Sequence, residues 1–161
     1  MMILSRVMDS ETAKVIALGV RKHNHISCTT KDALSQPHFA VMVDDQLTGW
    51  LGYRRSRKSK DAYEIMHMGI LPEFRRQGLA KQSVLEVLDL VYAAGGKRAF
   101  VRINFRNEPS MDLAKDMGFH LATRIGKVNY FSRKLDGHAV PVQEAAEDES
   151  EQEVHLEVCG E

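Results

Sequence analysis

The chain has 161 residues, of which 43% are hydrophobic and 27% are charged, and its formal net charge is zero. This length supports one domain with its own core, and the composition is typical of a soluble globular protein. No stretch approaches the ~20 apolar residues of a membrane-spanning helix, and charged residues interrupt each early apolar run, so we expect no secretory signal. Two cysteines, Cys28 and Cys159, are too few for a disulfide framework, which favours a cytoplasmic protein with free thiols.

The zero net charge hides an uneven distribution of charge. Residues 143–161 hold eight acidic residues and no Lys or Arg, whereas residues 1–142 hold 22 basic and 14 acidic residues. A block of like charge with few large apolar residues buries too little surface to offset its ordering entropy. The sequence therefore predicts a folded domain over residues 1–135 and a disordered acidic tail over residues 136–161.

The first part of the chain favours a strand followed by a helix. Residues 2–8 form a short apolar run that is typical of a strand. Ser10 precedes a helical pattern and is a suitable N-cap, because its hydroxyl can accept a hydrogen bond from a first-turn amide. Residues 21–36 are polar and irregular, with room for a short second helix. The apolar face of the first helix consists of Ala13, Ile16, Ala17 and Val20.

Three strands follow, joined by polar turns. We expect them over residues 39–43, 47–53 and 62–70. The first turn is acidic, Asp44 to Gln46, and the second is basic, Arg54 to Lys60. Because consecutive strands joined by short turns form hairpins, this part of the sheet is predicted to be antiparallel.

The second half of the chain alternates helix and strand. The clearest helix covers residues 78–94 and has an apolar stripe, and Gly95 and Gly96 follow it as a stop. The predicted elements of the whole chain then follow the order β-α-β-β-β-α-β-α-β-β. This order predicts an α/β fold with a mixed, mostly antiparallel central sheet flanked by helices. The remaining elements are a strand over 99–103, a short helix over 107–117, and a closing hairpin of strands 119–125 and 128–135.

The segment that joins the third of these strands to the long helix has the features of an anion site. The strand ends at Pro72, Arg75 and Arg76 follow, and Gly78 starts the helix. First-turn amides lack partners within the helix and lie at the positive end of its dipole, and a glycine lets the backbone approach a ligand. The turn is therefore suited to a pyrophosphate, although many helices begin in this way without a ligand. Gly69, inside the strand, indicates either a packing requirement or a strand edge left open for a ligand.

The run Arg75-Arg76-Gln77-Gly78-Leu79-Ala80 resembles the acetyl-CoA signature of the GNAT superfamily of N-acetyltransferases. That signature is Gln or Arg, two residues, Gly, one residue, and Gly or Ala. The resemblance covers residues 62–135 and implies a GNAT-like fold and an acetyl-CoA-dependent enzyme. Such an enzyme transfers an acetyl group to a primary amine of a small molecule, a protein or an aminoacyl acceptor. Matching offsets downstream of the signature are occupied by Asn107, Ser110, Leu113, Gly118 and Phe119.

The resemblance also implies how acetyl-CoA would be held. Backbone groups of Met68 and Ile70, with the small Gly69 between them, would bind the pantetheine arm as an added strand. Asn107 and Ser110 would contact the cofactor from the other side. Backbone N–H groups would cradle the pyrophosphate along one stretch of seven residues: Arg75, Arg76, Gln77, Gly78, Leu79, Ala80 and Lys81.

Transfer to an amine needs a base, because a Lys-like amine has a pKa of about 10.4 and is mostly protonated at neutral pH. The resemblance implies that Glu64 is this base, since several family members carry a catalytic glutamate at this position. A solvated strand glutamate is the alternative. Strand alternation places Glu64 on the same face as Met68, with His67 on the opposite face.

The general acid is less evident. Many relatives have a tyrosine seven residues after the asparagine, which acts toward the leaving thiolate, but here that position is Ala114. Ser110 is near by helical spacing but is a poor acid. Tyr130 has suitable chemistry and is the catalytic candidate, with hairpin packing as its alternative role.

Other functions also fit the sequence. Ala114 and the acidic tail would suit a catalytically weak acyl-CoA-binding or interaction module. The basic turn from Arg54 to Lys60 would suit a nucleic acid or another polyanionic partner, with a solvated hairpin as the alternative. His23 and His25 lack a further ligand at suitable spacing, so we expect no metal site.

Overall fold

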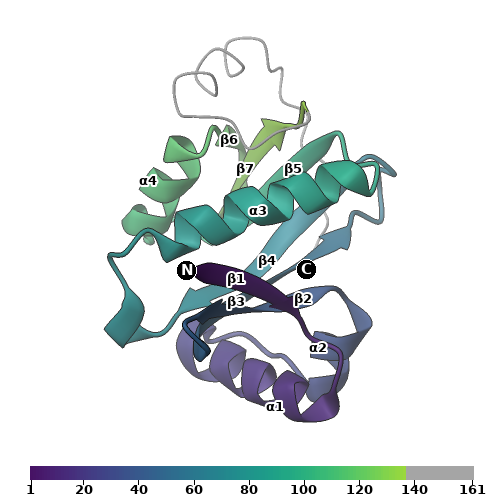
Figure 1. Ribbon diagram of the computed structural model, residues 1–161. Coiled ribbons are helices and arrows are strands. Elements are labelled where there is room, and N and C mark those ends of the chain that lie inside the picture. Colours follow the sequence, from purple (N-terminus) through teal and green to yellow (C-terminus); the bar gives the residue numbers. More distant parts are fainter. Residues whose placement is uncertain (137–161) are drawn as a thin grey trace. The chain divides into compact units, whose positions relative to one another are not determined.

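The computed structural model describes residues 1–136 (Figure 1). Almost all of the expected acidic tail therefore lies outside the described residues. The helices are α1 (Ser10–Gly19), α2 (Thr30–Ser35), α3 (Leu79–Ala93) and α4 (Glu108–Asp116), with a π-turn η1 (Val20–Asn24) and a 3-10 turn η2 (Pro72–Phe74). The strands are β1 (Met2–Arg6), β2 (His38–Val43), β3 (Gln46–Arg55), β4 (Ala62–Ile70), β5 (Arg98–Asn104), β6 (His120–Ile125) and β7 (Val128–Lys134).

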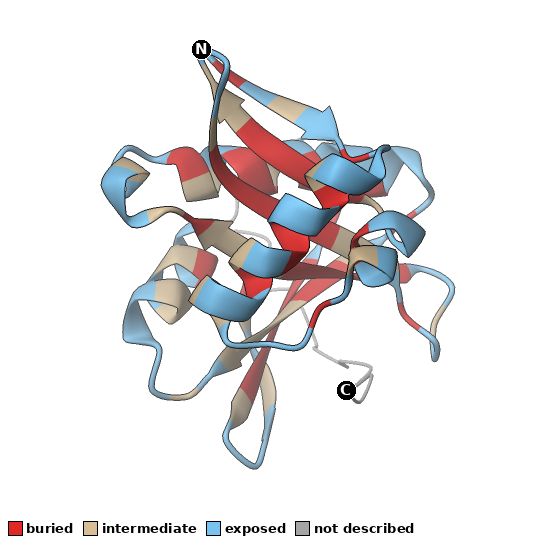
Figure 2. Ribbon diagram, turned by 90° about the horizontal axis from the view of Figure 1, so that it is seen from below, coloured by how far each residue is buried: buried red, intermediate tan, exposed pale blue. Residues whose placement is uncertain are grey.

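The strands form one seven-stranded sheet in the order β1-β2-β3-β4-β5-β7-β6. β4 and β5 pair in parallel, whereas β1 with β2, β2 with β3, β5 with β7 and β6 with β7 pair antiparallel. The predicted mixed, mostly antiparallel α/β fold is confirmed. Buried residues lie along the middle of the strands, and turns and outer helix surfaces are exposed (Figure 2).

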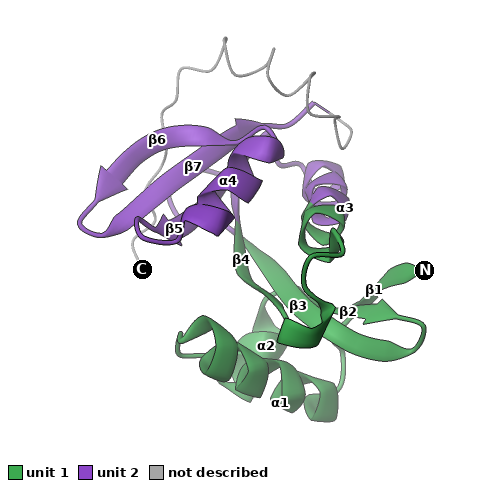
Figure 3. Cartoon of the chain, turned by 90° about the vertical axis from the view of Figure 1, so that its left-hand side faces the viewer, with its two compact units in different colours: residues 1–54, 65–84 green, residues 55–64, 85–161 purple. Residues whose placement is uncertain are grey.

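The chain divides into two compact units, residues 1–54 with 65–84, and residues 55–64 with 85–161 (Figure 3). The boundary crosses β4, whose first three residues belong to the second unit. Among the described residues, no helix is long and apolar enough to cross a membrane.

In the first unit, α1 and α2 pack on the strands β2 and β3 (Figure 1). The predicted apolar face of α1 is confirmed, because all four of its residues are fully buried. The predicted N-cap is wrong by one residue. Asp9 caps the helix, because its carboxylate accepts the Thr12 N–H at 2.8 Å and Ser10 is already helical. α2 begins with a reciprocal capping box between Thr29 and Asp32.

The indole of Trp50 is buried in the core of this unit and leaves no room for a side chain at two glycines. A Cβ on Gly19 would come within 2.7 Å of the indole Cη2, and a Cβ on Gly69 within 2.7 Å of Nε1. No side chain fits at that distance. The packing explanation of Gly69 is therefore sufficient, and this glycine does not by itself indicate a ligand.

In the second unit, β7 lies between β5 and β6. The β6–β7 hairpin follows α4, and β7, the last strand among the described residues, pairs with β5 from Arg98↔Lys134 to Asn104↔Val128. Ala62, Phe100 and Tyr130 form a buried cluster on one face of these strands.

Candidate cofactor and catalytic site

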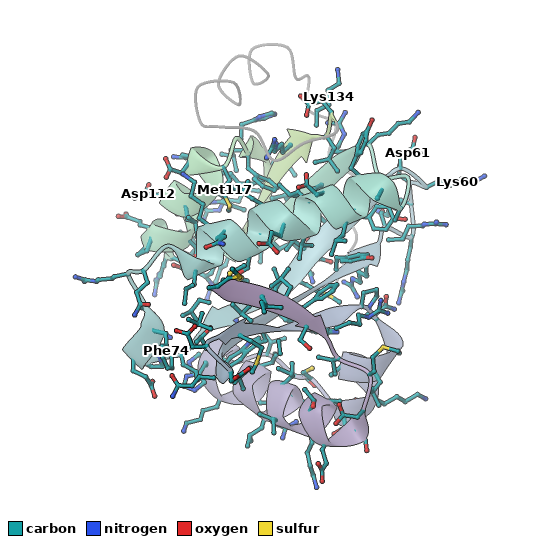
Figure 4. The ribbon with its side chains drawn as sticks, viewed as in Figure 1. Lys60, Asp61, Phe74, Asp112, Met117 and Lys134 are labelled. Atoms are coloured by element: carbon teal, nitrogen blue, oxygen red, sulfur yellow. The ribbon has the colours of Figure 1, made fainter. Side chains whose placement is uncertain are left out.

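The segment between β4 and α3 is a tight turn that exposes the start of a helix. η2 is closed by hydrogen bonds from Phe74 N–H to the Leu71 carbonyl at 2.9 Å and from Arg75 N–H to the Pro72 carbonyl at 3.3 Å. Figure 4 labels Phe74, which is half-buried in this turn. The carbonyl of Gly78 accepts from Gln82 N–H at 3.0 Å, so the helical hydrogen bonds of α3 begin at this glycine, and the first amides of an α-helix generally lack partners within the helix.

Gly78 has a left-handed backbone with φ of 77°, and nothing lies within 4 Å of the position that its Cβ would take. Arg76, two residues earlier, also has positive φ, at 66°. An open space therefore adjoins the positive end of α3, with two exposed arginines beside it. These residues fit a pyrophosphate, because a Cβ at Gly78 would enter the space that an anion needs.

Arg75 has a second task in this turn. Its Nε donates to the carbonyl of Ile70 at 2.8 Å, which ties the turn to the end of β4. The prediction that Arg75 contacts the phosphate stays a prediction, and the structure adds a positioning contact that the sequence did not indicate.

The backbone of β4 directs Met68 and Ile70 away from β3. Leu71 N–H bonds to the Thr48 carbonyl of β3 at 2.8 Å, and alternate residues of a strand direct their backbone groups to opposite edges. The carbonyls of Met68 and Ile70 therefore point to the other edge. There they accept side-chain donors, from Asn24 Nδ2 at 2.7 Å and from Arg75 Nε. At the edge predicted to hold pantetheine, both carbonyls therefore accept a hydrogen bond from a polar side chain of the protein.

Asn24 is a site residue that sequence reasoning missed. Its Oδ1 accepts from the Trp50 Nε1–H at 3.0 Å, and its Nδ2 donates to the Met68 carbonyl. The side chain therefore fixes η1 to β4 and orients the indole. A single asparagine in a polar segment carries no signal that would reveal this role.

His67 interrupts the regular geometry of β4. Its φ of 60° is left-handed, so strict alternation of side chains does not continue through it. The prediction that Glu64 and Met68 share a face, with His67 on the other, therefore does not follow from counting residues. His67 Nδ1 lies 3.0 Å from Nε2 of His38, and His38 Nδ1 lies 2.9 Å from the Gln36 carbonyl. Burial lowers the pKa of fully buried His38, and its carbonyl partner opposes this shift only in part.

Glu64 is not a solvated glutamate, because it is only 2% exposed. Arg102 Nε donates to Glu64 Oε2 at 2.7 Å, across the parallel strands β4 and β5. Arg102 is the second residue that the sequence did not identify, since 38 positions separate it from its partner. The buried carboxylate thus has the charged partner that burial requires.

The two predicted catalytic residues share one sheet face. Glu64 pairs with Phe100 in register, and Arg102 pairs with Tyr130, so the side chains of each pair lie on the same side. Phe100 and Arg102 are two residues apart on β5 and also share this side. Tyr130 is 5% exposed and packs in the cluster with Phe100, which supports a packing role.

Asn107 and Ser110 begin α4 in the second unit. The Asn107 side chain caps the helix, because its Oδ1 accepts Ser110 N–H at 3.2 Å. Ala114, one turn after Ser110, is 2% exposed. The cofactor contacts predicted for Asn107 and Ser110 stay predictions. Within residues 1–136, no three His, Cys, Asp or Glu side chains gather in a way that would hold a metal ion.

Comparisons with known proteins bear on the family and the fold of the chain. The model of the Acetyltransferase (GNAT) family matches residues 22–119, which include the turn and both strands of the buried ion pair. A comparison with curated proteins gave no match.

Many solved structures share the fold. A GNAT-family acetyltransferase from Desulfovibrio desulfuricans has a TM-score of 0.71 at 14% identity, over 84% of this chain and 100% of that one. The acetyltransferase yncA from Salmonella typhimurium, with its cofactor acetyl-CoA, has a TM-score of 0.67 at 17% identity, over 87% and 97%. PaiA N-acetyltransferase from Thermoplasma acidophilum, in complex with coenzyme A, has a TM-score of 0.69 at 14% identity, over 83% and 99%. The family match covers more than half of the chain, and the chain belongs to the Acetyltransferase (GNAT) family.

Proposed function

We propose that the chain is an N-acetyltransferase that uses acetyl-CoA and acetylates a primary amine. The observation that carries the proposal is the open space at Gly78, at the start of α3 and beside Arg75 and Arg76. The bound acetyl-CoA and coenzyme A of two structural neighbours support the choice of donor. The acceptor is the amine of a small molecule, a protein or an aminoacyl group.

The residues of the first unit would hold the donor. First-turn amides of α3 and the two arginines would bind the pyrophosphate, and backbone groups of Met68 and Ile70 would bind the pantetheine arm. Asn24 and the Arg75 side chain keep this strand edge in place through their bonds to the two carbonyls. When bound, acetyl-CoA would supply an acyl group on a thioester, which an uncharged amine can attack.

In the second unit, Glu64 would accept the proton of the amine. The Arg102 guanidinium holds its carboxylate at 2.7 Å, so one oxygen is oriented before the acceptor arrives. Because Glu64 is 2% exposed, a connecting water is the expected route for the proton. Tyr130 is on the same face and has the chemistry of a general acid, but its packing against Phe100 would make it at most a weak proton donor to the leaving group.

The test is release of free thiol from acetyl-CoA in the presence of a panel of amines. Glu64→Gln should lower turnover most at neutral pH and less at high pH, where the amine loses its proton unaided. Glu86→Gln, an exposed glutamate on α3, is the matched control and should leave the profile unchanged. Equal loss at every pH would show that Glu64 is structural.

One observation favours a second function. Ala114 is buried at the position where many relatives carry the acid tyrosine, which would suit an acyl-CoA-binding module with weak catalysis. This module would bind acetyl-CoA as tightly as the enzyme but release no thiol above background with any amine. Binding and turnover measured on one preparation therefore distinguish the two.

A further inference from the structure

Three segments of the second unit meet at one end of its strands. The Asp61 carbonyl accepts from Lys97 N–H at 2.7 Å and from Arg98 N–H at 3.1 Å, and the Lys97 carbonyl accepts from Leu135 N–H at 3.0 Å. These bonds join the β3–β4 turn, the start of β5 and the end of β7. Figure 4 labels Lys60, Asp61 and Lys134 from this region.

This region, which we term the basic end, concentrates positive charge. The sequence indicated only the turn, and the fold adds three cations from two distant segments. It contains only two acidic residues, Asp61 and Asp136. Its seven basic residues are exposed, except for half-buried Arg98: they are Arg55, Arg57, Lys58, Lys60, Lys97, Arg98 and Lys134.

The described residues supply no carboxylate partner for the lysines of the basic end. Among residues 1–136, no Asp or Glu side chain makes an ion pair with Lys60, Lys97 or Lys134. The basic end therefore has the properties of an anion-binding surface.

We propose that the basic end binds the chain's own acidic segment, residues 143–161. The described part of the chain ends at this surface, because Asp136 is the last described residue and its neighbour Leu135 is bonded to Lys97. Six residues, 137–142, separate Asp136 from the acidic segment, and they span up to about 20 Å when extended. The segment holds eight acidic and no basic residues, so its charge complements that of the surface.

The contact is electrostatic and within one chain. Exposed ion pairs are individually weak and are screened by salt, but a tether keeps the local concentration of the segment at about the millimolar level. The segment therefore occupies the basic end at low ionic strength and competes there with external polyanions.

The first experiment maps the contact by zero-length carbodiimide cross-linking of the full chain, followed by mass spectrometry. Carboxylates of residues 143–161 should join Lys58, Lys60, Lys97 and Lys134. The products should vanish at about 0.5 M salt, where the Debye length falls to a few ångströms. Mixing isotopically light and heavy chains separates contacts within a chain from those between chains. Cross-links spread evenly over exposed lysines such as Lys14 and Lys115 would overturn the proposal.

The second experiment measures binding of a labelled heparin oligosaccharide as a polyanion probe. A tail variant, with residues 147, 148, 149 and 151 changed to Gln or Asn, should bind the probe about tenfold more tightly at low salt, because the competing charges are removed. A patch variant with Gln at Lys58, Lys60, Lys97 and Lys134 should lose this difference. The charge-matched control, with Gln at Lys14, Lys22, Lys115 and Lys127, should keep it. If the tail variant binds heparin as weakly as the natural chain, the segment does not occupy the surface.

Discussion

Replacing Gly19 by alanine sets two effects of known size against each other. Gly19 is the last residue of α1 and has helical backbone geometry, so propensity alone predicts a gain of about 1 kcal/mol for Ala. Its Cβ, however, would lie 2.7 Å from Cη2 and 2.9 Å from Cζ3 of Trp50. Overpacking of a core costs about 1–3 kcal/mol. The indole cannot retreat easily, because Asn24 holds its Nε1 and Gly69 packs so closely that a Cβ there would lie 2.7 Å from Nε1.

We therefore place the overpacking cost at its upper end and expect Gly19→Ala to lower the free energy of unfolding by about 2 kcal/mol net. Urea denaturation followed by circular dichroism measures this loss. Leu18→Ala, at a neighbouring position that is 56% exposed, is the control and should change stability by less than about 0.5 kcal/mol. Adding Trp50→Phe should give a smaller total loss than the sum of the two single changes, because the shorter ring makes room. A stabilised Gly19→Ala protein would refute the packing described around the indole.

Three further predictions concern the second unit and the buried histidine. Arg102→Met should lower the free energy of unfolding by about 3 kcal/mol, because it removes the ion pair of the buried Glu64. Adding Glu64→Gln should restore part of this loss in urea denaturation, whereas purely additive losses would contradict the pairing. Tyr130→Phe should reduce turnover less than ~10-fold, since its role is packing, and a loss of about a hundredfold with unchanged cofactor affinity would instead make it the general acid. The pKa of His38 lies below its unfolded value, so its contribution to stability is full above pH ~6.5 and falls as the pH drops below that value. His38→Gln should flatten the dependence of the free energy of unfolding on pH, whereas His25→Asn, at an exposed position, should not.

Local patterns in the sequence were enough to predict most elements. Apolar periodicity identified α1 and α3, and the alternation of turns and apolar runs identified the strands and their order along the chain. The cap of α1 was missed by one residue, because Asp9 and Ser10 are both good caps, and Asp9 gains a second hydrogen bond from the Thr12 hydroxyl at 3.0 Å. The position of β7 between β5 and β6 depends on pairing between distant segments, which local patterns do not encode.

The site residues were likewise predictable only where the signal is local in the sequence. The turn around Gly78 was predictable, because glycine, arginines and a helix start are adjacent in the sequence. The partners Arg102 and Asn24 were not, since each acts on a residue at least 26 positions away. The left-handed His67 also escaped prediction, because the backbone there is set by its surroundings and histidine carries no strong preference for that conformation.

The thermal response to acetyl-CoA tests the central claim, that the turn before α3 binds the donor. At a concentration of about 100 times Kd, binding adds about 2.7 kcal/mol, which should raise the Tm by several degrees. Gly78→Glu should abolish the rise, because a carboxylate would fill the open space of the turn. Gly126→Glu is the matched control, since Gly126 also has positive φ and nothing within 4 Å of its Cβ position, and it should keep the full rise. An unchanged Tm of the natural chain at millimolar acetyl-CoA, or an equal rise in both variants, would contradict the account.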